Sequence, residues 1–438
     1  MKRQRTTRVL RLTSLISFLC LSWAGLAHAD AVTDWNAIAI QTIATAMVNG
    51  VPAHPGGAAL LDSAMVQVAV YDAVVAIEGR FKPYHVHITG ASGSPAAGVA
   101  KATHDVLVNR FPFLSDSLDT TYHDYLSSHG LAEDDPGVAV GQQAAAGIIA
   151  LRANDGSFPS NPTPFFGGTD PGVWRPTPPT FAPMVTVWVA TVPPFTLKGP
   201  DQFRAPKPPA LTSHRYTEAY NEVKALGSVS GSARTPEQTD LALFWAANYQ
   251  VVWNEALRNL ADAHVHNIAE SARLFALANL AMADAVITVW DSKVHYLLWR
   301  PVTAIQEGDE DGNPETVGDP TWLPLIPTPA YPDYTSGANG VTGSVTRSLA
   351  LFFGTDHMNF SLTTTNPAAV QQTRMYTRFS EAAAEVVDAR IYEGIHFRFA
   401  DVVARRQGRH VAQWVFSHFL QPVDDDHDDD HDDDDDDR

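Results

Sequence analysis

The sequence predicts an all-α fold, a bundle of roughly nine to eleven helices joined by two long proline-rich connections. Three observations support this prediction. Stretches rich in Ala, Leu, Val and Met carry polar residues at helical intervals, whereas strand-like alternation is scarce. Fourteen of the 30 prolines fall between Pro159 and Pro209, which interrupts the helical pattern there. The composition, 45% hydrophobic and 18% charged, is that of a globular chain.

The stretches with helical spacing define the expected helices, at residues 32–48, 58–78, 94–111, 136–153, 235–262, 266–299, 337–353, 366–392 and 396–420. The stretch VTVWVATV at 185–192 is the best strand candidate. A second proline-rich segment, 311–334, separates two helices. We expect a single helical domain over residues 30–423, with active-site motifs in 293–401.

The proline-rich segment 159–209 is expected to be an extended connection packed over the helices. It holds Trp174, Phe181 and Trp188 among its prolines. These aromatic residues leave two interpretations open: the segment covers the mouth of a pocket, or it is a surface excursion pinned by aromatic contacts.

Residues 1–29 have the pattern of a secretory signal peptide. Five basic residues precede or begin an apolar stretch from about Leu12 to Leu26, and Ala27-His28-Ala29 follows it. The stretch is too short and too interrupted for a transmembrane helix. We therefore expect an exported protein, periplasmic or extracellular, with no membrane span in the mature chain; an uncleaved N-terminal anchor is the alternative. The one cysteine, Cys20, lies here, which excludes a disulfide framework.

Residues 424–438 form an Asp/His-rich tail that we expect to be disordered, because it has no apolar side chain to bury. The tail carries twelve aspartates and one arginine, and residues 1–29 carry five positive charges. Without these two ends the formal charge of −19 becomes −13, so residues 30–423 are still acidic. No basic surplus exists to neutralise phosphates, and we expect no nucleic-acid partner. His427 and His431 in the tail could bind a divalent cation weakly.

The sequence lacks several common catalytic signatures: HExxH, CxxC, the GxSxG elbow and the phosphate-binding GxxxxGK[ST] loop. Three other segments place anion-binding residues at helix ends. The first is Lys293-Val-His-Tyr-Leu-Leu-Trp-Arg300-Pro301. Lys293 and Arg300 are seven residues apart, about two helical turns, so a continuous helix would present both on one face. Two cations there could alternatively complement the helix dipole.

The second segment, Pro332-Asp-Tyr-Thr-Ser-Gly-Ala-Asn-Gly340, leads into the apolar run 341–353. Thr335 or Ser336 is a suitable N-cap, and Gly337 allows backbone N–H groups to approach an anion closely. By itself the segment is equally typical of an ordinary helix start.

The third segment, Asp388-Ala-Arg-Ile-Tyr-Glu-Gly-Ile-His-Phe-Arg-Phe-Ala-Asp401, contains Arg390 and His396. On an unbroken helix these two would lie about 120° apart. Gly394 offers a helix stop, so that Arg390 closes one helix and His396 opens the next. A lone histidine here could also be a structural residue.

Together the three segments resemble the active-site signature of the vanadium-dependent haloperoxidase and type 2 phosphatidic acid phosphatase superfamily: K-x6-RP, then PSGH, then SR-x3-G-x-H-x3-D. The resemblance runs from about Trp35 to about Leu420 and is closest to the soluble, secreted bacterial haloperoxidase-like branch. It implies a helical bundle of the vanadium haloperoxidase and acid phosphatase type.

The resemblance also implies roles for individual residues. Lys293, Arg300 and Arg390 would neutralise the equatorial oxygens of bound vanadate or phosphate, with added hydrogen bonds from Ser336 and the Gly337 N–H group. His396 would be the catalytic axial residue, either the sole protein bond to vanadium or the nucleophile that forms a phosphohistidine.

Two positions depart from the signature. The histidine that ends the second motif, a general acid or base in the family, is Ala338 here. The resemblance also expects a catalytic aspartate four residues after His396, but that position is Ala400. Asp401, the next residue, is the candidate catalytic acid beside His396, although a helix turns its side chain by about 100° from the expected direction. Possible substitutes for this acid are Asp333, Tyr334, His295 and His357, of which the first two lie nearest the anion-binding turn.

Three functions follow as alternatives. The first is an exported vanadium-dependent haloperoxidase that binds vanadate and uses hydrogen peroxide to oxidise halide. The second is a secreted phosphomonoesterase acting on a phosphate ester through a phosphohistidine. The third is a non-catalytic phosphate-binding protein that lost its acid at Ala338.

Overall fold

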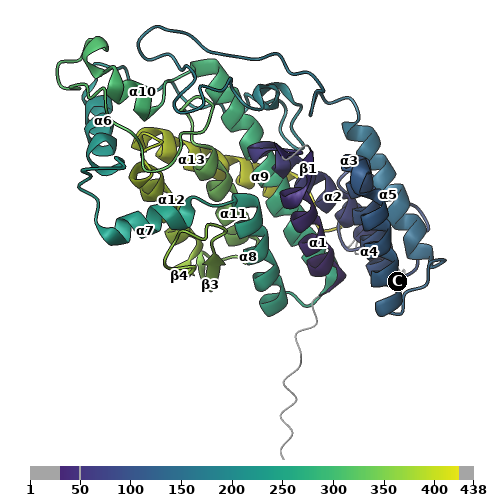
Figure 1. The fold of residues 1–438 in the computed structure, drawn as a ribbon. Coiled ribbons are helices and arrows are strands. Elements are labelled where there is room, and N and C mark those ends of the chain that lie inside the picture. Colours follow the sequence, from purple (N-terminus) through teal and green to yellow (C-terminus); the bar gives the residue numbers. More distant parts are fainter. Residues whose placement is uncertain (1–29, 49–50, 424–438) are drawn as a thin grey trace, which may run out of the picture.

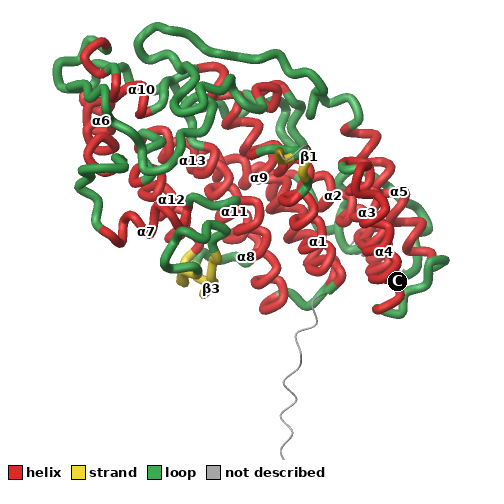
Figure 2. Tube along the Cα trace, in the orientation of Figure 1, coloured by secondary structure: helices red, strands yellow, loops and turns green. Residues whose placement is uncertain are grey.

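A computed structural model describes residues 30–48 and 51–423 of the chain. The predicted signal peptide and acidic tail lie outside the described residues. The described part contains thirteen α-helices, more than the nine to eleven expected, and two antiparallel two-stranded sheets (Figures 1 and 2). The helices are α1 (Ala31–Thr45), α2 (Ala59–Glu78), α3 (Pro95–Arg110), α4 (Ser115–Ser128), α5 (Pro136–Arg152), α6 (His214–Leu226), α7 (Pro236–Trp245), α8 (Tyr249–His264), α9 (Ile268–Tyr296), α10 (Pro301–Gln306), α11 (Gly337–Phe352), α12 (Phe379–Tyr392) and α13 (Arg398–His418).

The all-α prediction is confirmed, and most predicted helices agree with the observed ones to within a few residues. The expected helix at 235–262 is instead two helices, α7 and α8. Thr235 begins α7 with a capping box, and Asn248 begins α8 by accepting hydrogen bonds from the backbone of Gln250 and Val251. The two strong caps explain why the apolar periodicity alone gave the wrong boundary.

Three helices were missed: α4, α6 and α10. The sequence of α4 is mostly polar, and its buried side chains are Leu118, Tyr122 and Leu126. These three are spaced four residues apart, which makes one narrow apolar stripe on a helix. Three apolar residues in a mostly polar stretch are too few for the composition of the segment to indicate a helix.

The sequence predicted a strand where none forms, and it predicted a helix where a strand forms. Residues 185–192 hold a 3-10 helix, Val187–Thr191, and no strand. The larger sheet pairs β3 (His357–Thr363) with β4 (Thr373–Arg378), and β4 lies inside the predicted helix 366–392. Buried Phe360 and Tyr376 face each other across this hairpin with ring centroids 5.3 Å apart. Cross-strand aromatic packing of this kind favours the hairpin over a helix. The other sheet pairs β1 (Met47–Val48) with β2 (Val51–Pro52).

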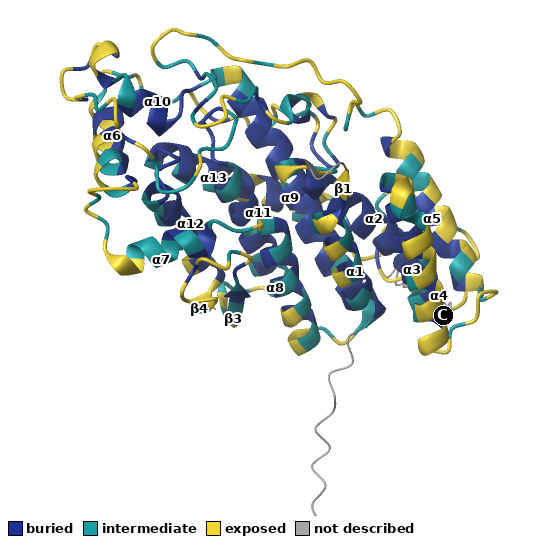
Figure 3. Cartoon of the chain, viewed as in Figure 1, coloured by how far each residue is buried: buried dark blue, intermediate teal, exposed yellow. Residues whose placement is uncertain are grey.

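Helix α9 runs through the middle of the molecule. It packs against α2, α11 and α13, with α1, α3, α4 and α5 on one side and α6, α7, α10 and α12 on the other (Figure 1). The buried residues concentrate around this central helix (Figure 3). By length and composition alone, Gly56–Glu78 and α9 could span a membrane, but 89% and 94% of their most apolar windows is buried inside the protein. Core helices of a globular protein have the same character.

The proline-rich segment crosses one end of the bundle as an irregular connection (Figure 2). Its backbone is tied to the turn after α9: the Trp174 N–H group donates to the Leu297 carbonyl (2.6 Å), and the Trp299 N–H group donates to the Gly172 carbonyl (3.0 Å). Buried Asp284 of α9 accepts the backbone N–H groups of Phe195 and Thr196 at 2.7 and 2.8 Å. The segment therefore braces the turn that leads to Arg300.

Candidate oxyanion-binding site

Lys293 and Arg300 converge on one backbone segment, although they do not share a helix. Helix α9 ends at Tyr296, Leu297 has a left-handed backbone (φ +49°), and Arg300 is the N-cap of α10. The Lys293 Nζ atom donates to the carbonyls of Pro332 (2.6 Å) and Asp333 (3.1 Å). Both cations are fully buried. The turn at Leu297, and not a helix face, brings them together.

The guanidinium of Arg300 holds the second and third segments at once. Its Nε atom donates to the Tyr331 carbonyl at 2.7 Å, and its Nη1 atom donates to the Ile395 carbonyl at 2.7 Å. Burial lowers the pKa of both Lys293 and Arg300 from the ordinary values, and for Lys293 the nearby Arg300 charge adds to the effect. Such a pair gains stability from an anion placed between the two cations.

Ser336 is the N-cap of α11 and Gly337 its first residue, as the sequence predicted. The Ser336 side chain caps no backbone N–H group of its own helix. The N–H groups of the first helical turn have no acceptors within the helix and carry the positive end of its dipole. The turn is therefore built to receive an anion.

The helix stop expected at Gly394 is present. Helix α12 ends at Tyr392, Gly394 has φ +81°, and His396 lies in the connection before α13. A Cβ atom on Gly394 would lie 2.4 Å from the Gly227 carbonyl oxygen, so the position requires glycine for both backbone angle and space. This break allows Arg390, in the last turn of α12, and His396 to face the same site.

His396 is oriented by Asp333. The ring Nδ1 atom lies 2.7 Å from Asp333 Oδ1, and Arg300 Nη1 lies 3.2 Å from the ring Nε2 atom. A guanidinium only donates hydrogen bonds, so Nε2 carries the lone pair and Nδ1 carries the proton given to Asp333. Burial, with the charges of Arg300, Lys293 and Arg390, holds the pKa of His396 well below its ordinary value. The imidazole is thus neutral, with its lone pair on Nε2.

Asp401 does not orient His396, which corrects the expectation from the signature. Its Oδ1 atom accepts from Asn339 Nδ2 at 2.8 Å. Asp401 therefore supports the start of α11. Of the four proposed substitutes only Asp333 contacts the imidazole: the Tyr334 hydroxyl donates to the Pro206 carbonyl, and the side chains of His295 and His357 are exposed.

Glu393 is a site residue that the sequence analysis missed. It is fully buried and pairs with Arg390, whose Nη1 atom lies 2.8 and 2.6 Å from the two carboxylate oxygens. Burial raises the pKa of Glu393 to about 7, although Arg390 opposes the rise. The i, i+3 spacing of Arg390, in the last turn of α12, and Glu393, its C-cap residue, was the available signal.

Three buried cations face three buried carboxyl groups in this site: Lys293, Arg300 and Arg390 against Asp333, Glu393 and Asp401. Burial raises the pKa of Asp333 to about 7 and that of Asp401 well above its ordinary value. Arg300 Nη2 and Arg390 Nε are buried with no hydrogen-bond partner in the described residues. The donors fit a tetrahedral oxyanion, which would satisfy them.

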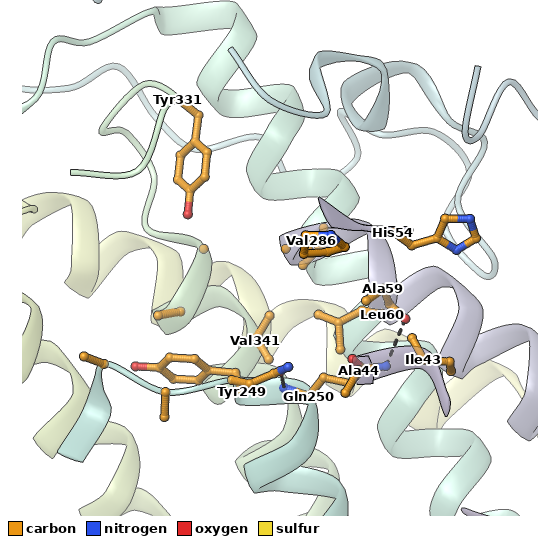
Figure 4. Close-up of a pocket in the computed structure, with 18 of the residues that line it drawn as sticks. Ile43, Ala44, His54, Ala59, Leu60, Tyr249, Gln250, Val286, Tyr331 and Val341 are labelled. Carbon is orange, nitrogen blue, oxygen red and sulfur yellow. Dashed lines mark hydrogen bonds between the residues drawn. The ribbon is translucent and has the colours of Figure 1, made fainter. Parts of the chain in front are cut away.

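A cavity of about 390 Å³ adjoins this cluster (Figure 4). Gly337, Ala338 and Arg390 line it together with Trp290, Tyr249 and Tyr331. Figure 4 shows Tyr331 and His54 at opposite ends, with the apolar side chains of Leu60, Val286 and Val341 between them. No residue of 159–209 lines the cavity, which favours the interpretation of that segment as a pinned surface excursion.

Tyr331 separates the cavity from the two innermost cations. Its ring lines the cavity and lies 4.9 Å from Lys293 Nζ and 4.8 Å from the Arg300 guanidinium carbon. Both distances are those of cation–π contacts. Lys293, Arg300 and His396 do not line the cavity themselves, so the Tyr331 ring lies beside the route into the site.

Comparisons with known proteins agree with this geometry. A family model described as the VCPO second helical-bundle domain matches residues 273–425, which include all three motif segments. The vanadium chloroperoxidase of Curvularia inaequalis is 30% identical over an alignment that covers 33% of this chain. That alignment covers 29% of the chloroperoxidase, so the chain spans under a third of the curated relative that it matches.

Solved structures share the fold over most of the chain. A bacterial vanadium-dependent iodoperoxidase superposes with a TM-score of 0.72 at 23% identity, covering 90% of this chain and 96% of that one. The holo form of a bacterial vanadium-dependent chloroperoxidase superposes with a TM-score of 0.67 at 16% identity, covering 86% and 93%. These likenesses show that the chain has the helical-bundle fold of those structures, and residues 273–425, which hold the three motif segments, match the VCPO second helical-bundle family model.

Proposed function

We propose that this protein is a vanadate-dependent haloperoxidase, which oxidises halide with hydrogen peroxide. The observation that carries the proposal is the cluster of three buried cations, one helix N-terminus and one neutral imidazole around unpaired guanidinium N–H groups. Bound vanadate would supply a Lewis-acidic centre for peroxide activation.

Each residue around the site would have its own role in binding the oxyanion. Lys293, Arg300 and Arg390 would balance the charge of the oxyanion, and the Gly337 N–H group and Ser336 hydroxyl would donate to its oxygens. His396 would bind through Nε2, because Asp333 holds the proton on Nδ1. Asp401 would keep Asn339, in the first turn of α11, in place.

Ala338 is the main departure from the superfamily signature, and it makes a specific prediction. The methyl group of Ala338 lines the cavity, so an imidazole at this position would face open space. A338H should restore a proton donor beside the oxyanion and raise the halide-oxidation rate about 100-fold, within the usual range for general acid–base catalysis. Stopped-flow halide oxidation with saturating vanadate measures this rate. A rate no higher than that of the original chain would show that another group already supplies the proton.

The activity itself is tested with the purified full chain, hydrogen peroxide, and iodide or bromide, before and after loading with orthovanadate. Vanadate-dependent oxidation that H396A abolishes supports the proposal. Hydrolysis of a phosphate ester without vanadate would point to the phosphomonoesterase. Tight phosphate binding with neither turnover would point to the binding protein.

Arg390 tests the site assignment independently of turnover. R390A removes one of three buried cations facing the anion, and orthovanadate affinity measured by titration calorimetry should fall at least tenfold. R398A is the matched control, because Arg398 is partly exposed and pairs with Glu222 and Asp388. Equal affinity of R390A and R398A would contradict the site.

We also propose export, on the signal-like pattern of residues 1–29. Expression of the full chain in a bacterial host should yield a periplasmic or secreted protein whose intact mass corresponds to a chain beginning at Asp30. A cytoplasmic product of full mass would contradict this proposal.

A further inference from the structure

The outer face of α13 carries a basic groove whose lining includes none of the motif residues. The groove has a volume of about 400 Å³ and is lined by Arg347 of α11 and by Val402, Arg405, Arg406, Arg409, His410 and Gln413 of α13. The α13 residues follow one another at helical intervals of three and four, so they form one continuous face. Among the described residues, no carboxylate lines the groove.

Close packing of two helices creates this groove. A Cβ atom on Gly408 would lie 2.0 Å from the Gly340 carbonyl oxygen, and one on Gly343 would lie 2.4 Å from the Arg405 carbonyl oxygen. The two glycines let α11 and α13 approach closely, which brings Arg347 beside the α13 arginines. The groove is therefore a fixed feature of the fold.

The four arginines are not neutralised by the described part of the protein, where none of them makes an ion pair. Arg347 donates to the Gln413 side chain, and Arg405 donates to the Ala383 carbonyl. Burial and the neighbouring Arg409 charge lower the pKa of Arg405. Asp388, the carboxylate that acts on Arg405 from α12, is already bound by Arg398. Like charges at this spacing destabilise a helix, so the cluster favours an anionic ligand.

The chain itself contains a complementary polyanion. Residues 424–438 include twelve aspartates, and they follow directly after Val423. The starting point of this tail is fixed, because the Val423 N–H group donates to the Arg80 carbonyl and the Lys82 N–H group donates to the Gln421 carbonyl. Helix rise and extended-chain length put Val423 within about 31 Å of Arg409, whereas fifteen extended residues reach about 50 Å.

We propose that the basic groove of α11 and α13 is a polycarboxylate-binding site whose occupant is the acidic tail of the same chain. This assignment rests on the opposite charges of the groove and the tail, and on the extended length of the tail, which exceeds the distance from Val423 to the groove. A tethered tail has an effective concentration on the order of millimolar, so even weak ionic contacts keep the groove filled at low salt. External polyanions would have to displace the tail.

The test uses two full-length chains: the natural one, and one in which the twelve tail aspartates are replaced by serine. A fluorescein-labelled peptide of residues 424–438 is titrated into each by fluorescence anisotropy. The peptide should bind the serine-tail chain at least tenfold more tightly than the natural chain, and binding should weaken at least tenfold when salt rises from about 20 to about 300 mM. Equal binding to both chains, or to neither, would overturn the proposal.

Variants of the groove separate it from general surface charge. In the serine-tail chain, R406Q/R409Q should weaken peptide binding at least fivefold, whereas K207Q/R215Q, which removes two exposed charges elsewhere, should leave it unchanged. All four side chains are exposed, so folding should be retained; R409Q alone is the milder variant if the pair misfolds. Equal effects of the two double substitutions on peptide binding would contradict the groove as the binding site of the tail. A dimer of the natural chain that the serine tail abolishes would assign the occupant to a second copy and overturn the intramolecular contact.

Discussion

At the scale of single residues, the site depends on which acid holds the imidazole. Asp333 is fully buried, and its Oδ1 atom lies 2.7 Å from His396 Nδ1 and 3.9 Å from Arg300 Nη1. The same carboxylate thus fixes the ring and balances one cation. Asp401, the acid nearest to the signature position, is engaged with Asn339 instead.

D333N should lower orthovanadate affinity about 10–100-fold, the usual cost of removing a partner that orients a histidine ligand. An asparagine accepts the Nδ1 proton less strongly and leaves Arg300 without its negative neighbour. Titration calorimetry measures the affinity, and D388N, which changes a partly exposed carboxylate, is the control. An affinity equal to that of D388N would contradict the role of Asp333.

Glu393 gives a prediction about pH and stability. Because burial raises its folded pKa to about 7, above the ordinary 4.5, the stabilising contribution belongs to the protonated form. That contribution is fully present below about pH 4.5 and is lost as pH rises through about 7. The free energy of unfolding of the natural chain should therefore fall relative to E393Q between these values, by at most about 3 kcal/mol. Urea unfolding at pH 4.5, 6 and 8 measures the difference, and a constant difference would be inconsistent with this pKa.

At the scale of elements, the break between α12 and α13 determines how Arg390 and His396 face each other. Gly394 has a left-handed backbone and no room for a side chain, because Gly227 approaches it. The residues that form this break are adjacent in sequence. The residue that packs against Gly394, however, lies at the end of α6, far away in the chain.

G394A should therefore destabilise the protein more than an alanine at an unconstrained left-handed glycine. The control is G354A, since Gly354 has φ +70° and no atom of the described residues lies within 4 Å of the place that a Cβ atom would take there. The backbone angle costs each variant about 1–2 kcal/mol, and the clash should add about 1–3 kcal/mol in G394A. Chemical unfolding compares the two, and equal losses would mean that the Gly227 contact relaxes freely.

At the scale of the whole molecule, α9 connects the motif segments to the proline-rich segment. It carries Lys293 near its end and Asp284 two to three turns earlier, where the carboxylate accepts the N–H groups of Phe195 and Thr196. One core helix thus positions a site cation and anchors the segment that braces the turn to Arg300.

D284A should leave two buried N–H groups without an acceptor, at a cost of about 1–3 kcal/mol each. We expect the segment 159–209 to be cleaved faster by a protease of broad specificity, with mass spectrometry locating the cuts. D201A, in the same connection but exposed, is the control. Identical cleavage patterns for both variants would show that Asp284 does not anchor the segment.

The sequence by itself determined the helical class and the order and spacing of the three motif segments, including the stop at Gly394 and the helix start at Ser336. These features depend on backbone hydrogen bonds and side-chain periodicity within a few residues, so local pattern reveals them. Lys293 and Arg300 were also identified correctly as neighbours, although the turn at Leu297, and not a shared helix face, makes them so.

Tertiary structure decided which residues from distant segments of the chain contact one another. Asp333 reaches His396 over 63 positions, Arg347 joins the α13 arginines over about 60, and the β3–β4 hairpin replaces part of a predicted helix. Such pairings depend on how helices pack, on close approaches at Gly343 and Gly408, and on burial that alters charge. None of these is encoded in local periodicity, which is why the choice between Asp333 and Asp401 needed the folded chain.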